Sequence, residues 1–152
     1  MKTNKIKKVL IAIDYDETSQ KVAEQGFSMA QAMNAETILL HVISEQPVYY
    51  SGYAYMRELR VDFYDNLEDS TQKFLDKTKH DLGDKTIQTI IKEGDTAELI
   101  LESAKKLKAD IIVIGTHSRK WMENILMGSV AENVLRHTTI PLFIIPTKKH
   151  EK

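Results

Sequence analysis

The chain has 152 residues, of which 42% are hydrophobic and 28% are charged. These values are typical of one globular domain that buries its own core, and they exclude a disordered or membrane-embedded chain. The formal net charge of -1 argues against a general nucleic-acid surface, because such binding needs many Lys and Arg contacts to phosphates. The absence of cysteine excludes disulfides, thiolate catalysis and cysteine-ligated metals.

The beginning of the chain has a strand-helix-strand pattern. Residues 6–13 are almost continuously apolar, which predicts a strand buried on both faces that ends at Asp14. This apolar run is too short for a signal peptide, so we expect a cytoplasmic protein. Thr18 or Ser19 can cap a helix, and residues 36–43 predict a second strand. We therefore expect a parallel pair of strands joined by a right-handed crossover.

Residues 44–58 break this pattern and predict an irregular surface loop. The segment contains Pro47, Gly52 and four tyrosines, with no period of two or of 3.6. Long irregular loops in compact domains are often functional, which makes this one a candidate lid or partner surface. The alternative is that the tyrosines only pack the loop onto its own domain. A long helix over residues 59–82 and a third strand over residues 85–92 are expected next.

The second half of the chain continues the alternation of strands and helices. Asp95 and Glu98 have the spacing of a capping box, which predicts the start of a helix. Residues 111–114 are apolar and β-branched, which predicts a buried fourth strand over residues 110–114. Ser129 and Glu132 repeat the capping spacing, so we expect the last helix to begin at Ser129.

Five strands that alternate with four helices predict one α/β domain over residues 1–147, with a parallel, doubly wound sheet. The last strand extends from Pro141 to Ile145, and a charged tail follows over residues 148–152. No internal repeat or low-complexity tract is visible in the sequence.

The polar loop before the last helix has the features of a phosphate cradle. Gly115 ends the fourth strand, and Gly128 and Ser129 stand at the expected helix start. A helix N-terminus presents unpaired N–H groups and a partial positive charge, which favour a bound phosphate. The Ser129 hydroxyl either caps its own helix or leaves only backbone donors for the ligand. Glycines in such a loop also serve ordinary tight turns.

Asp14 is expected to lie near this loop. Ligands of doubly wound sheets bind beyond the carboxyl ends of the strands, and both Asp14 and Gly115 follow a strand. If the first and fourth strands are neighbours, Asp14 faces the loop across a crevice, which favours a nucleotide site. Taken alone, Asp14 is explained equally well as a residue that caps the turn after the first strand and as a ligand contact.

The histidines and the loop cations have different expected roles. His41 lies inside the second strand and is expected to be packed and hydrogen-bonded, whereas His117 in the polar loop is expected to touch the ligand. None of the five histidines has the spacing of a metal cluster. Arg119 and Lys120 are interpreted as solvated charges in preference to phosphate ligands.

The sequence resembles the universal stress protein family. Nucleotide-binding members of that family carry Gly-x2-Gly-x9-Gly-Ser/Thr after the fourth strand. This chain has Gly115 and Ser118 at the first two glycine positions, then nine residues, then Gly128 and Ser129. The segments VLIAID, LLHVI and KEGDTAELIL are also similar, so the resemblance covers nearly the whole chain.

The resemblance implies a flavodoxin-like, adenine nucleotide alpha hydrolase-like fold with strand order 3-2-1-4-5 and helices on both faces. It also implies bound ATP, or AMP or ADP, with Mg²⁺ accompanying the phosphates. A homodimer is implied through the apolar strand from Pro141 to Ile145, because an edge strand needs cover. The cofactor-binding residues that it implies are Asp14, Val42, Gly115, His117, Ser118, Gly128, Ser129 and Val130.

Two residues depart from the family pattern. Ser118 replaces the second glycine. With a negative φ its hydroxyl can donate to a phosphate, whereas a positive φ costs about 1 kcal/mol and weakens binding about fivefold. Asp16 stands where the family often has serine, and a second carboxylate near Asp14 repels a triphosphate unless a cation lies between them.

The expected function is that of an ATP-binding stress-response regulator that acts as a dimer. The alternative is a nucleotide-independent dimeric scaffold of the same family, with the tyrosine-rich loop as its contact surface. A phospho-acceptor receiver domain is less consistent with the sequence, because Asp95 is expected to begin a helix. No group is identifiable that positions water against a γ-phosphate, so the sequence predicts slow ATP hydrolysis at most.

Overall fold

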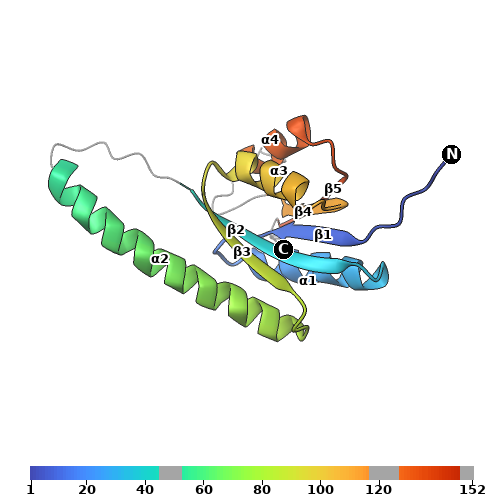
Figure 1. Ribbon diagram of the computed structural model, residues 1–152, viewed down its shortest axis with the longest axis horizontal. Coiled ribbons are helices and arrows are strands. Elements are labelled where there is room, and N and C mark those ends of the chain that lie inside the picture. The colour runs from blue at the N-terminus through green and yellow to red at the C-terminus, as the bar shows by residue number, and fades with distance from the viewer. Residues whose placement is uncertain (45–52, 117–126, 148–152) are drawn as a thin grey trace, which may run out of the picture.

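The computed structural model describes residues 1–44, 53–116 and 127–147, with the side chains of residues 53–65 excluded. Five strands form one parallel sheet in the order β3-β2-β1-β4-β5 (Figure 1). This order confirms the topology that the resemblance implies. The strands are β1 (Lys8–Ala12), β2 (Glu36–Ser44), β3 (Gln88–Gly94), β4 (Ile111–Gly115) and β5 (Leu142–Ile145).

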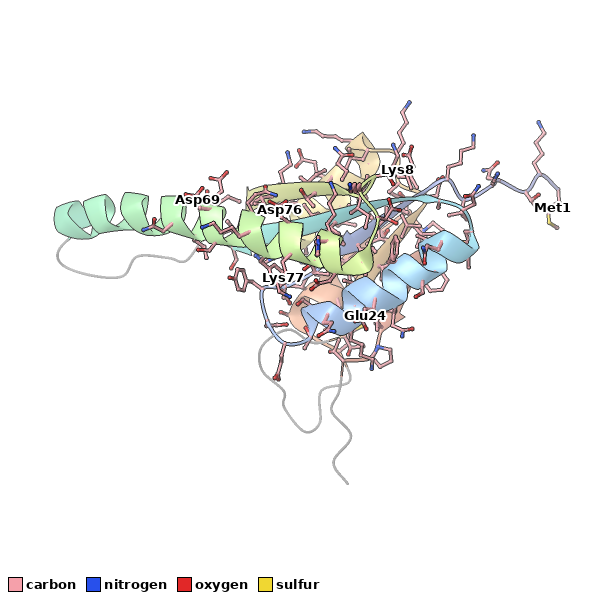
Figure 2. The ribbon with its side chains drawn as sticks, turned by 90° about the horizontal axis from the view of Figure 1, so that it is seen from below. Met1, Lys8, Glu24, Asp69, Asp76 and Lys77 are labelled. Atoms are coloured by element: carbon pink, nitrogen blue, oxygen red, sulfur yellow. The ribbon has the colours of Figure 1, made fainter. Side chains whose placement is uncertain are left out.

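Helices cover both faces of the sheet, as expected. Helices α1 (Ser19–Ala32) and α2 (Tyr53–Leu82) lie on one face, and α3 (Thr96–Lys106) and α4 (Ser129–His137) lie on the other (Figure 1). The first part of α2 extends beyond the end of the sheet in both views (Figures 1 and 2). No helix among the described residues is both long enough and apolar enough to cross a membrane.

The alternation of side chains along the strands explains the two layers of helices. Ile11 belongs to the core under α1 and α2, and its neighbour Leu10 belongs to the core under α3 and α4. The two side chains are both 0% exposed, because successive residues of a strand point to opposite faces. A strand that is covered on both faces must be apolar throughout, which accounts for the continuous apolar run around β1.

Two boundaries differ from the sequence prediction by three residues or more. Helix α2 begins at Tyr53 instead of residue 59, so the prediction of an irregular loop is wrong for residues 53–58. None of these residues breaks a helix, and the helix starts directly after Gly52, the last strong breaker. The other part of that prediction, residues 45–52, lies outside the described residues.

Strand β3 begins at Gln88, three positions later than predicted, because a side-chain turn precedes it. The Asp84 carboxylate accepts hydrogen bonds from the Thr86 amide (2.8 Å) and the Thr86 hydroxyl (2.6 Å). The same hydroxyl bond lowers the pKa of Asp84 below its ordinary value. This local bonding competes with the sheet ladder, so residues 85–87 do not join the strand.

Gly26 allows α1 to pack closely on the sheet. A Cβ atom at this position would lie 2.8 Å from Cδ1 of Ile11 and 3.2 Å from Cγ1 of Val113. Both neighbours are fully buried, so they have little room to move. Alanine has a higher helix propensity than glycine, but the close packing on the sheet excludes its Cβ atom at this position.

We expect Gly26→Ala to lower the free energy of unfolding by about 1 kcal/mol, because overpacking outweighs the gain in helix propensity. Chemical denaturation measures the change. The neighbouring exposed residue provides the control, since Gln25→Ala gains propensity without meeting the sheet. A more stable Gly26→Ala protein would contradict the close packing of α1.

Candidate functional site

A cavity lies at the carboxyl ends of β1 and β4, beside the N-terminus of α4. The connections leave these adjacent strands toward opposite faces, which creates a crevice at this point of a doubly wound sheet. The volume of the cavity is about 70 Å³. Six of the eight predicted site residues line it, namely Asp14, Val42, Gly115, Gly128, Ser129 and Val130. The other two, His117 and Ser118, lie outside the described residues.

A second cavity adjoins the first one. Its volume is about 380 Å³, and it shares Thr96, Ser129 and Val130 with the first cavity. Pockets for small ligands measure roughly 300–1,000 Å³, so the second cavity lies within that range. The N-terminal residues of α3 and α4 both contribute to its wall. Thr96 was not predicted as a site residue, although the capping Asp95 places it at the same edge of the sheet as Asp14.

The start of α4 differs from the predicted capping box. Ser129 is the first helical residue, as expected, but Gly128 occupies the cap position and no side chain caps the helix. Glu132 forms an ion pair with Arg136 at 2.6 Å instead of reaching back to the helix start. The Ser129 hydroxyl therefore does not cap its own helix.

The backbone amides at the start of α4 differ in whether they have an acceptor. The Gly128 amide donates to the Thr116 carbonyl at 2.5 Å, so it is not available to a ligand in this structure. The amides of Ser129, Val130 and Ala131 have no acceptor within the described ranges. These three N–H groups lie at the positive end of the helix dipole and beside the cavity.

Thr116 connects the cavity to the last strand. Its amide donates to the Ile145 carbonyl at 3.0 Å, and its hydroxyl accepts from the Thr147 amide at 3.0 Å. Together with the bond from Gly128, these contacts fix the end of β4 between α4 and the segment after β5. Thr116 directly follows Gly115, but the sequence contains no signal for this role, since each partner is distant in the chain.

His41 and Ile13 hold the end of β1. The Ile13 amide donates to the Leu40 carbonyl at 2.9 Å, one step beyond the last residue of β1. Nδ1 of His41 lies 2.7 Å from the Ile13 carbonyl oxygen, and the side chain of His41 is buried. The expectation of a packed, hydrogen-bonded histidine is confirmed. Asp14 follows directly and is half-buried in the cavity wall.

Asp16 does not line the cavity that Asp14 lines. Its Oδ1 atom accepts hydrogen bonds from the Thr18 amide (2.8 Å) and the Thr18 hydroxyl (2.6 Å), which draws the carboxylate toward the start of α1. Asp16 instead lines a cavity between α1 and α2. Glu24 on α1 and Lys77 on α2, both labelled in Figure 2, also line this cavity. The predicted repulsion between Asp16 and a triphosphate beside Asp14 stays a prediction, because Asp16 is only two residues from Asp14 in the chain.

The described residues provide no metal site of their own. No group of three or more His, Asp or Glu side chains among them is arranged to hold an ion. Asp95 caps α3 by accepting from the Glu98 amide at 2.9 Å, which confirms the predicted helix start and disfavours a receiver-type phosphorylation site.

The sheet order and the crevice define a doubly wound α/β protein with a flavodoxin-like, nucleotide hydrolase-like fold. The chain matches the universal stress protein family over residues 5–146, and it belongs to this family.

Relatives and solved structures agree with this assignment. Universal stress protein MJ0531 of Methanocaldococcus jannaschii is 31% identical over 148 residues, which cover 97% of this chain and 86% of the relative. The solved structure of the hypothetical protein MJ0577 is 27% identical, with a TM-score of 0.77 and coverage of 97% and 100%. A universal stress protein crystallised in complex with cAMP is similar in fold, with a TM-score of 0.65, 22% identity and coverage of 95% and 100%.

Proposed function

We propose that this protein binds ATP, or ADP or AMP, in the paired cavities beside α4 and acts as a dimeric stress-response regulator. The observation that carries the proposal is the convergence of three chemically distinct groups on one cavity. These groups are the amides at the start of α4 that have no acceptor among the described residues, the carboxylate of Asp14 and the backbone of Val42. Each of them matches a different part of an adenine nucleotide.

The start of α4 matches the phosphates. The amides of Ser129, Val130 and Ala131 have no acceptor in the described parts of the chain, and the dipole of α4 adds a partial positive charge. Anions bind at helix N-termini for these reasons. Mg²⁺ would enter with the nucleotide, since triphosphate oxygens are hard ligands and the described residues supply no metal cluster.

Val42 matches the base. The Leu40 carbonyl pairs with β1, and alternate residues of a strand direct their backbone N–H and C=O to the same neighbour. Val42 therefore presents a donor and an acceptor on the side where β1 has ended. This pair is complementary to N1 and the amino group of adenine. The cAMP complex of a protein with the same fold adds support for an adenine nucleotide.

We expect Ser129→Pro to weaken ATP binding about tenfold or more, because proline removes one amide that donates to a charged phosphate. Proline is tolerated at the first helical position, and the backbone of Gly128 (φ -67, ψ 162) suits a following proline. Isothermal titration calorimetry with ATP and AMP measures the effect. AMP should lose less affinity than ATP, since it lacks the outer phosphates.

Ser129→Ala is the matched control, because it removes the same hydroxyl and keeps the amide. Equal affinities for ATP in the two variants would argue against phosphate binding at this helix. If the parent protein gave no heat with ATP at millimolar concentration, the nucleotide-independent scaffold would remain as the function of this chain.

The dimer proposal rests on the β5 edge of the sheet. Among the described residues, strand β5 has a neighbour on one side only, and Phe143 on this strand is 46% exposed. Edge strands with exposed apolar side chains tend to pair with another chain, and a second copy paired along β5 would cover Phe143.

We expect Phe143→Lys to shift the protein from dimer to monomer at micromolar concentration, because a charge on this edge opposes strand pairing. Analytical ultracentrifugation measures the shift. Gln88→Lys introduces the same side chain at an exposed position of the other edge strand, β3, and should leave the dimer intact. A parent protein that is monomeric under these conditions would refute the dimer.

A further inference from the structure

The end of β1 departs from a regular parallel ladder at a single hydrogen bond. In such a ladder the Ile13 carbonyl would accept from the amide of Val42, two residues after Leu40. The structure instead places Nδ1 of His41 at 2.7 Å from this carbonyl oxygen. Within the described residues, no acceptor is bonded to the Val42 amide.

The position of the imidazole shows how the replacement works. His41 and Leu39 project from the same face of β2, and Leu39 belongs to the core under α1 and α2. The ring therefore reaches the Ile13 carbonyl from that face, while the Val42 amide lies along the sheet. A carbonyl accepts but does not donate, so Nδ1 carries the hydrogen. The side chain of His41 is only 9% exposed, which protects this bond from water.

We propose that His41 is a positioning residue of the nucleotide site, an inference that rests on the proposed nucleotide binding. By donating to the Ile13 carbonyl in place of the Val42 amide, His41 turns the chain away from β2 at the point where Asp14 begins. The same bond leaves the Val42 amide for the base. The buried side chain of His41 thus positions the carboxylate of Asp14 and keeps the amide of Val42 available, although His41 itself touches no ligand.

A rescue experiment tests this role. Asparagine places an N–H donor where His41 has Nδ1, whereas leucine has a similar size and no donor. We expect His41→Leu to weaken binding about tenfold, as for one lost buried hydrogen bond, and His41→Asn to bind almost as well as the parent. The loss should be the same for ATP and AMP, because both Asp14 and Val42 lie at the base and sugar end of the ligand.

Two further measurements separate positioning from a general loss of stability. The effects of His41→Leu and Asp14→Asn should be less than additive in a double-mutant cycle, because the first acts through the second. Thr37→Val removes another buried polar group from β2, at the end remote from the cavity, and should leave ATP affinity unchanged. Denaturation of each variant provides the comparison of stability.

The outcomes distinguish this inference from the proposed function. Lack of ATP binding by the parent would refute the proposed function. Normal ATP binding by His41→Leu, or additive effects with Asp14→Asn, would refute the role of His41 alone. Independently of any ligand, the ¹⁵N spectrum of the imidazole should show hydrogen on Nδ1, and hydrogen on Nε2 only would overturn the inference.

Discussion

Burial of β1 on both faces is the constraint on which this structure depends. The strand lies in the middle of the sheet, with β2 on one side and β4 on the other, and helices cover both of its surfaces. Val9, Leu10 and Ile11 are all 0% exposed. Because the crossovers after β1 and β4 go to opposite faces, the layers separate at the carboxyl ends of these strands. The cavity is a consequence of that separation.

The parts of this fold that sequence reasoning predicted are those with repeated or doubly signalled patterns. Five apolar runs and the strand-helix alternation predicted the sheet, and Asp95 with Glu98 predicted the start of α3, where the cap bond is present. The resemblance to the family added the strand order. The binding residues that the resemblance implies could be placed at one edge of the sheet, because parallel strands end at the same side.

What the sequence did not predict depends on competition between partners. The spacing of Ser129 and Glu132 matches that of Asp95 and Glu98, yet Glu132 pairs with Arg136 one turn later and leaves Gly128 as the cap. The occupied amide of Gly128 depends on the Thr116 carbonyl across the loop. Likewise Asp16 is bonded within its own turn, so its carboxylate is directed toward the start of α1. A local sequence pattern indicates which hydrogen-bond partners are possible, but the partner that is used depends on the folded structure.

The cavity wall is assembled from segments that are far apart in the chain, including the end of β1, the middle of β2 and the starts of α3 and α4. No single supersecondary unit contains the whole wall, so partial opening of the domain at any of these elements would dismantle it. A ligand in this cavity would therefore be coupled to cooperative folding of the entire domain. At a concentration 100 times its dissociation constant, it would add about 2.7 kcal/mol to global stability. Protection from heat or proteolysis would then extend to elements that the ligand never touches.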